Sequence, residues 1–158
     1  MILINPRTSK KRNVYLVDLG TGTTRNHLPL SIGLIPSYSN NNSDIKANYD
    51  IHLNFLRSKP EDFVATLQDP VVVGFACYQW NFKASLKLAN FIKRQFPSCL
   101  IVLGSYSVPH IPSHVEDFMK AHPFVDVLVH DEGELSCSEI LLALLEGRSF
   151  SKVEGISY

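Results

Sequence analysis

The sequence predicts an α/β fold: a single domain, residues 1–158, built on a five-stranded parallel, doubly wound sheet of the flavodoxin-like type. Short apolar runs alternate with amphipathic stretches through five units, the order of strands and crossover helices in a parallel sheet. Residues 71–76 and 100–103 are continuously apolar, and residues 125–129 are apolar except for Asp126, which is typical of strands covered on both faces. With 158 residues and 45% hydrophobic side chains, the chain suits one compact domain.

The remaining strands come from weaker patterns. Residues 13–19 are β-branched and aromatic and end at Gly20, as expected for a first strand. Residues 49–56 alternate apolar and polar side chains, which is typical of a strand at or near a sheet edge. Residues 153–158 are predicted to form a last, short edge strand.

Two long helices follow from amphipathic spacing. Residues 81–96 place apolar side chains on one face and lysines on the other, and Pro97 ends the helix. Residues 132–146 are rich in leucine and stop at Gly147, a residue suited to a helix C-terminus.

Three further helices are shorter. One begins at Pro60, with two acids in its first turn, and another spans residues 112–121. Residues 30–39 form the weakest candidate, because their glycine and proline both lower helix stability. The Asn-Asn-Asn-Ser run at 40–43 is predicted to be a loop in the first crossover.

Charge and composition exclude several classes of function. Fifteen basic residues balance fifteen acidic ones, so the chain lacks the basic excess that binds nucleic acid or anionic membranes. No apolar run approaches the ~20 residues that cross a bilayer, and the first twelve residues are too polar for a secretory signal. The three cysteines lie far apart in the sequence, so their spacing predicts neither a disulfide framework nor a Cys-x-x-Cys metal site. A cytoplasmic protein is expected.

Ligands of open α/β sheets bind at the carboxyl ends of the strands. The loops expected there carry small residues after strands one and four, aromatic residues after strand three and acids after strand five. This edge suits a ligand with both flat apolar and polar parts.

Familiar motifs fit these loops poorly. Gly20-Thr21-Gly22 lacks the third glycine of a dinucleotide fingerprint and the lysine of a phosphate loop, so a turn is the simpler interpretation. The residues offer no receiver-type acid pair. His110 and His114 have no third ligand in register and are interpreted as surface histidines. Cys77 is expected to be a small buried side chain.

Several segments together resemble a known family. They include 28–33 (LPLSIG), 73–81 (VGFACYQWN), 101–105 (IVLGS), 131–134 (DEGE) and 153–158 (VEGISY). In this order and spacing they resemble the N-terminal cobalamin (vitamin B12)-binding domain of cobalamin-dependent radical S-adenosylmethionine (SAM) enzymes. The acidic turn and the closing Gly-Ile-Ser-Tyr are the most specific segments.

The resemblance implies that a corrin ring lies across the carboxyl edge of the sheet. It also implies a partner radical SAM domain, in cis or in trans, that holds the [4Fe–4S] cluster and S-adenosylmethionine, because this chain has no cysteine triplet. The chain is then not catalytic alone, and the usual outcome in the family is methyl transfer. No catalytic residue, protein ligand to a metal, nucleic acid or membrane partner is expected.

Four positions depart from the family pattern. Gly20 stands where related modules carry a cobalt-ligating histidine, which implies a base-off cofactor without a histidine ligand. Ser105 replaces the second glycine after strand four, Ala76 replaces a common serine of strand three, and Asp131 replaces the first glycine of the acidic turn.

The resemblance assigns roles to the edge loops. Tyr78 and Trp80 are expected under the corrin ring, Gly104 and Ser105 beside the nucleotide tail, and Asn81 at the helix N-cap. The full set of expected cofactor-binding residues is His27, Leu28, Pro29, Leu30, Cys77, Tyr78, Trp80, Asn81, Gly104, Ser105, Tyr106, Pro109, Asp131, Glu132, Gly133 and Glu134.

Two alternatives remain open on the sequence. The threonine-rich loop at 21–24 partly resembles the phosphate loop of FMN-binding flavodoxins, although Leu19 and Pro29 oppose that interpretation. The departures at Ala76, Ser105 and Asp131 also suit a degenerate module that binds no cofactor and serves as an interaction domain.

Overall fold

A computed structural model describes residues 10–20, 29–55, 59–130 and 132–158. Its strands are β1 (Arg12–Val17), β2 (Tyr49–Asn54), β3 (Pro70–Ala76), β4 (Leu100–Gly104), β5 (Val127–Val129) and β6 (Ile156–Ser157). Its helices are α1 (Leu30–Ser39), α2 (Ser43–Asn48), α3 (Pro60–Thr66), α4 (Phe82–Gln95), α5 (Pro112–Ala121) and α6 (Gly133–Glu146), with a 3₁₀ turn η1 (Phe150–Lys152) before β6.

The six strands form one sheet in the order β2-β1-β3-β4-β5-β6. The first five are parallel, and β6 pairs with β5 in the antiparallel sense. The parallel part has the flavodoxin-like order that the sequence predicts, with β2 at one edge and β6 at the other. The predicted fold class is therefore confirmed.

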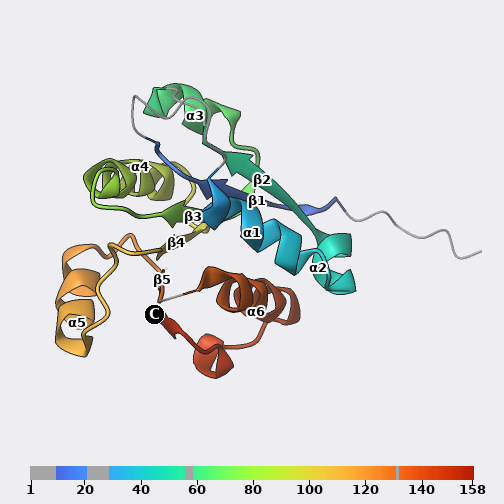
Figure 1. The fold of residues 1–158 in the computed structure, drawn as a ribbon. Helices are drawn as coiled ribbons and strands as arrows, with labels where there is room; N and C mark the ends of the chain where they lie inside the picture. Colours follow the sequence, from blue (N-terminus) through green and yellow to red (C-terminus); the bar gives the residue numbers. More distant parts are fainter. Residues whose placement is uncertain (1–9, 21–28, 56–58, 131) are drawn as a thin grey trace, which may run out of the picture.

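Helices α3, α4 and α5 cover one face of the sheet, and α1, α2 and α6 cover the other (Figure 1). Successive side chains of β1 alternate between the faces: Tyr15 and Val17 join the cluster under α3, α4 and α5, whereas Val14 and Leu16 join the cluster under α1, α2 and α6. Burial of both faces explains why the central strands are apolar without alternation. No helix in the described ranges has the length and apolar character to cross a membrane.

In the first crossover, residues 40–42 form a turn, as the predicted loop requires, but a helix that the sequence did not predict begins at Ser43. The Asn42 Oδ1 accepts hydrogen bonds from the backbone N–H groups of Asp44 (2.9 Å) and Ile45 (3.2 Å), which caps α2. Ile45 is then fully buried in the cluster beneath α1 and α6. A single apolar anchor in a polar segment gives too little periodicity for a helix to be predicted.

Helix α1 forms although it contains Pro36. It packs against α6, where the Ser39 and Ser138 hydroxyls share a buried hydrogen bond of 2.8 Å. Ile32 is almost completely buried in the same interface. Tertiary packing thus outweighs the weak helix propensity of this segment.

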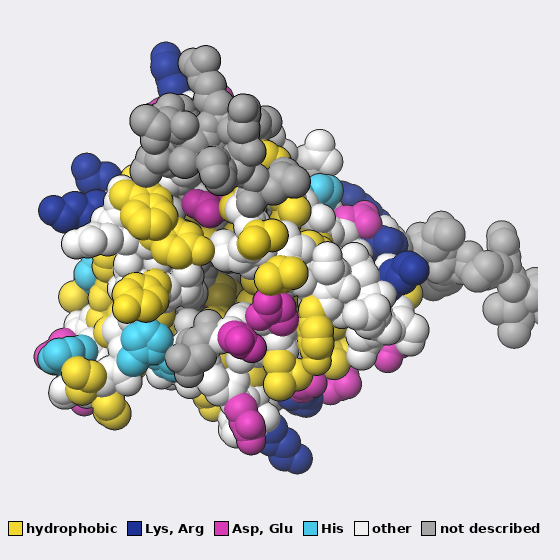
Figure 2. Space-filling model, viewed as in Figure 1, with side chains coloured by type: hydrophobic (Ala, Val, Ile, Leu, Met, Phe, Trp, Pro, Cys, Tyr) yellow, Lys and Arg dark blue, Asp and Glu magenta, His cyan; other side chains and the backbone are white. Residues whose placement is uncertain are grey.

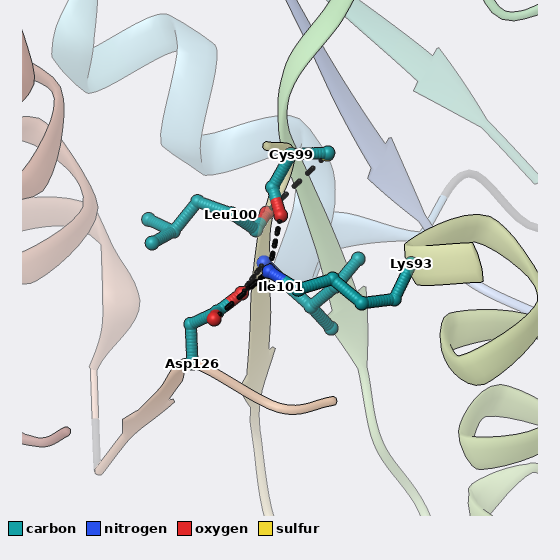
Figure 3. Close-up of polar contacts among 5 residues, drawn as sticks. All are labelled: Lys93, Cys99, Leu100, Ile101 and Asp126. Carbon is teal, nitrogen blue, oxygen red and sulfur yellow. Dashed lines mark hydrogen bonds and ion pairs between the residues drawn. The ribbon is translucent and has the colours of Figure 1, made fainter. Parts of the chain in front are cut away.

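A partly buried ion pair fastens α4 to the amino ends of β4 and β5 (Figure 3). The Lys93 ammonium donates to both carboxylate oxygens of Asp126 (2.9 and 2.7 Å) and to the Cys99 carbonyl (2.8 Å). The same carboxylate accepts the Ile101 N–H at 2.6 Å. Because all these groups are satisfied, the network ties three elements together at the end of the sheet opposite the carboxyl-edge loops.

Replacement of Asp126 by alanine is expected to lower the free energy of unfolding by about 2 to 3 kcal/mol, because it leaves the Lys93 ammonium and the Ile101 N–H without their acceptor. Urea unfolding followed by circular dichroism measures the change. The matched control is Glu116→Ala, which breaks an exposed pair with Lys120 and is expected to cost less than about 1 kcal/mol. Equal losses in the two variants would contradict the assigned role of the network.

Candidate functional site

A cleft of about 190 Å³ opens at the carboxyl edge of the sheet, between α1 and α6. Figure 2 shows a hollow in the middle of this face, with hydrophobic side chains within and around it and acidic side chains along one side. Its lining comes from the ends of β1, β3, β4 and β5 and from the two helices. The lining residues are Leu16, Ser31, Ile32, Ile35, Gly74, Phe75, Ala76, Val102, Gly104, Ser105, Val129, Glu132, Gly133, Glu134 and Cys137.

Glycines keep the floor of the cleft open. A Cβ atom on Gly74 would lie only 3.0 Å from the Leu16 Cδ2, and one on Gly104 would meet the Val129 Cβ at 3.4 Å. Below Gly74 the cleft continues into a small apolar cavity of about 20 Å³, which also reaches Ile140. The deep part of the cleft, between the two helices, is therefore lined mainly by apolar side chains.

Few polar groups face this cleft. The Ser31 Oγ is buried and has no hydrogen-bond partner among the described residues. Burial, with a smaller contribution from the Glu134 charge, raises the pKa of the Cys137 thiol to about 12, so the thiol stays protonated. Glu132 and Glu134 also line an outer groove with Tyr38, and they therefore lie at the mouth of the cleft.

An aromatic pair stands in the β3–α4 loop. The rings of Tyr78 and Trp80 stack with centroids 4.7 Å apart and planes 9° from parallel. Tyr78 packs against the apolar cluster under α1 and α6, whereas Trp80 is 63% exposed. The pair thus presents a large apolar surface at the carboxyl edge of the sheet.

Asn81 fixes this loop, but not by the predicted helix cap. No capping hydrogen bond of its side chain exists. Instead, its Oδ1 accepts the Tyr78 N–H at 2.7 Å, and its Nδ2 donates to the Ala76 carbonyl (3.0 Å) and the Asp18 carboxylate (3.3 Å). Burial raises the pKa of Asp18, and the Asn81 hydrogen bond opposes that shift. The buried amide therefore joins the ends of β1 and β3, and this replaces the capping prediction.

Gly104, Ser105, Glu132, Gly133 and Glu134 are the predicted site residues that line the cleft. The remaining ones lie elsewhere, as follows. Leu30 and Tyr106 are 72% and 90% exposed, Pro29 and Pro109 are half-buried, and Cys77 is completely buried in the cluster on the opposite face of the sheet. His27, Leu28 and Asp131 fall outside the described residues.

The side chain of Cys77 does not reach the cleft, contrary to its inclusion among the cofactor-binding residues. Burial raises the pKa of its thiol to about 12. Its backbone N–H donates to the Gly104 carbonyl (2.9 Å), and its carbonyl accepts the Ser107 N–H (3.0 Å). Cys77 therefore holds the β3 and β4 loops together through its backbone, and its side chain is the small buried group that the sequence predicts.

Sequence reasoning did not assign Ser31, Gly74 and Cys137 to the site. Gly74 could have been predicted from the sequence, since a glycine inside an apolar strand often marks a point where a ligand or another backbone approaches closely. Ser31 and Cys137 lie on helices, and only the rotation of α1 and α6 about their axes turns them into the cleft.

The histidines of the β4–α5 region do not form a metal site. The His110 ring lies 5.2 Å from that of His130, which contacts the Ser157 hydroxyl at 2.8 Å. Across the described parts of the chain, no group of three or more His, Cys, Asp or Glu side chains is arranged to hold a metal ion.

Ser105 adopts a backbone conformation that favours glycine, with φ at +76°. It follows β4 directly and lines the cleft beside Gly104. A side chain in this region costs roughly 1 kcal/mol or more relative to glycine. The family resemblance places a second glycine at position 105, and the positive φ observed there is a conformation that glycine adopts with less strain than serine.

Comparisons with known proteins decide the relationship. A 2-(S-pantetheinyl)-carbapenam-3-carboxylate methyltransferase of Streptantibioticus cattleyicolor is 35% identical over 154 residues, which cover 96% of this chain and 22% of that protein. The cobalamin-dependent radical SAM methyltransferase TokK of Streptomyces tokunonensis is 34% identical over 94% of this chain and 21% of its own length. This chain is a relative of the cobalamin-dependent radical SAM methyltransferases. The resemblance stated from the sequence is confirmed.

The chain spans about a fifth of the length of these methyltransferases. Among solved structures, the cobalamin-dependent SAM radical enzyme OxsB with bound aqua-cobalamin matches 94% of the chain and 21% of its own, with a TM-score of 0.74 and 22% identity. This likeness shows a shared fold. No family model matches the chain.

Replacement of Ser105 by glycine is expected to raise the free energy of unfolding by about 1 kcal/mol, because it removes the strain at positive φ. Urea unfolding measures the gain. Ser107→Gly in the same loop is the control, and it is expected to destabilise the protein slightly, because its backbone is not in that region. A loss of stability in Ser105→Gly would contradict the assignment of strain.

The Cys77 and Cys99 thiols are expected to be unreactive in the folded protein at pH 8, because both are fully buried and burial raises their pKa to about 12. Ellman's reagent should label them at the rate of unfolding, and at once in denaturant. In the unfolded chain the thiols have their ordinary pKa of 9.0 and lose their protons above about pH 9, whereas in the folded chain they stay protonated. The free energy of unfolding should therefore fall as pH rises above about 9. Immediate labelling of either thiol in the folded chain would contradict this burial.

Proposed function

We propose that the chain is a cobalamin-binding module of a radical SAM methyltransferase, with the cofactor held base-off and without a histidine ligand from the protein. The observation that carries this proposal is the glycine-floored apolar cleft at the carboxyl edge of a sheet that shares its fold with OxsB. The names of the sequence relatives point to the same cofactor.

The described residues fit the cofactor. The cleft is lined mainly by apolar side chains, and its floor at Gly74 and Gly104 has no side chains, which suits the flat heterocycle of a nucleotide tail. The buried Ser31 Oγ in this cleft has no hydrogen-bond partner among the described residues, which suits a hydroxyl that binds a ligand.

The residues outside the cleft suit the corrin ring. Tyr78 and Trp80 form a stacked surface that buries well against a flat apolar macrocycle. Asn81 fixes the loop that carries them, through hydrogen bonds to two strand ends. Within the cleft, Gly104 and Ser105 would hold the tail through close backbone approach.

Base-off binding follows from Gly20. This residue ends the described loop after β1 and stands where related modules place a histidine, so that position offers no imidazole. The nearby carboxylate of Asp18 accepts a hydrogen bond from the Asn81 side chain.

When bound, cobalamin supplies methyl-transfer chemistry, and this chain's residues bind and orient it. A second domain, in cis or in trans, would hold the [4Fe–4S] cluster and S-adenosylmethionine. The four-fifths of the relatives' length that this chain does not match leaves ample room for such a domain.

The experiment is a titration of the purified chain with hydroxocobalamin, followed by absorbance and calorimetry. Saturable binding with a base-off spectrum is expected, and FMN, the ligand of the flavodoxin alternative, should not bind. Trp80→Ala is expected to weaken binding about tenfold, since it removes the exposed half of the aromatic pair. Phe91→Ala, which removes a part-exposed aromatic ring on α4 away from the cleft, is the matched control.

Binding of FMN in place of cobalamin would overturn the proposal in favour of a flavin module. A folded chain that binds neither cofactor would favour the degenerate interaction domain, an alternative that the strain at Ser105 supports.

A further inference from the structure

The outer groove, on the solvent side of α1 and α6, is apolar and open to water. It has a volume of about 470 Å³, and its apolar lining comes from Leu34, Tyr38 and Leu135. Each of these side chains is about half exposed. Leu34 and Tyr38 are four residues apart, so they lie on one face of α1. Exposed apolar side chains that gather in one groove, unlike those scattered singly, mark an interaction surface.

The rim of the outer groove is acidic. Glu132 and Glu134 line it at the amino end of α6, and neither carboxylate forms an ion pair with a described residue. Unpaired negative charge beside an apolar surface favours a partner that carries positive charge beside an apolar surface. It disfavours a two-fold contact of the groove with itself, which would bring four carboxylates together.

Helix α4 carries the complementary surface, on the opposite face of the sheet (Figure 1). The helix contains no acidic residue, and its exposed side carries Ala84, Lys87, Phe91 and Arg94 at intervals of three, four and three residues. This spacing places the four side chains in one row along the helix, here called the α4 stripe. Lys87 and Arg94 flank the part-exposed Phe91 ring, and neither forms an ion pair with a described residue.

We propose that the outer groove of one copy of this chain binds the α4 stripe of a second copy, so that the molecules associate head to tail. The Phe91 ring would pack against Leu34 and Tyr38 in the groove. Lys87 and Arg94 would meet the two glutamates at its rim. The groove and the stripe lie on opposite faces of each molecule, so a pair of copies leaves one groove and one stripe free.

The contact is expected to be weak and open-ended. One helix seated in one groove buries less surface than a stable dimer needs, so the dissociation constant should be on the order of 100 µM. Because the free groove and the free stripe accept further copies, the average mass should keep rising with concentration beyond that of a dimer. Salt should weaken the contact, since it screens charges at the surface.

Sedimentation equilibrium of the purified chain, from about 10 µM to about 1 mM, measures this association. The weight-average mass should rise from the 17.8 kDa of the monomer to more than twice that value. Two charge-reversed variants follow: Lys87→Glu with Arg94→Glu changes the stripe, and Glu132→Lys with Glu134→Lys changes the groove. Each variant alone should stay monomeric, because its groove and its stripe then carry charge of the same sign.

An equimolar mixture of the two variants should recover the association. The reversed stripe of one variant fits the reversed groove of the other, and the unchanged groove and stripe also fit each other. Lys152→Glu is the control, because it reverses an exposed cation on the turn η1, outside both surfaces, and should associate like the unchanged chain. Circular dichroism establishes that every variant is folded.

Several outcomes would overturn the inference. They are an unchanged chain that stays monomeric over the whole range, a mass that levels off at a dimer, reversed variants that still associate, and a mixture that stays monomeric. The inference does not depend on the proposed function. The variant with Lys87→Glu and Arg94→Glu leaves the cleft intact, so it should bind cobalamin as the unchanged chain does, whatever its state of association.

Discussion

Burial of both faces of the parallel sheet is the constraint on which the rest of the structure depends. Each strand must be followed by a helix that covers one face, and the chain changes face where β1 and β3 lie side by side. After β1 it enters α1 on one face, and after β3 it enters α4 on the other. The cleft lies at the carboxyl edge on the face that α1 and α6 cover, where glycines keep side chains out of its floor.

The same edge collects the features that lower stability. Ser31 buries a hydroxyl without a partner among the described residues, Ser105 holds a positive φ, and Gly74 lines a small apolar cavity. At the opposite end of the sheet, the Lys93 ammonium and the Asp126 carboxylate are paired and hydrogen-bonded. Backbone strain occurs at both ends, since Asp69 before β3 also has a positive φ, but the unpartnered Ser31 hydroxyl lies in the cleft, where a ligand can reach it.

The fold could be predicted because its signals are local. Apolar runs mark the strands, and residues such as Pro97 and Gly147 mark where helices end. The site could be predicted only in part. Residues next to strand ends, such as Gly104 and Glu134, were found because their place in the fold follows from the strand order. Ser31, Cys137 and the hydrogen bonds of Asn81 depend on helix rotation and loop closure, which are set by packing between distant segments and leave no periodic trace.

The last strand has a consequence for how the molecule meets its own copies. A parallel sheet that ended at β5 would present an open backbone edge, a template for further strands. The β6 strand closes that edge, held by the His130 N–H to the Gly155 carbonyl (2.8 Å) and by the Ser136 hydroxyl to the Glu154 carbonyl (2.9 Å). At the far edge, β2 carries the charged Asp50 and its Lys11 partner. Both margins thus resist sheet-to-sheet aggregation, one because the short antiparallel strand β6 covers β5 and the other by charge.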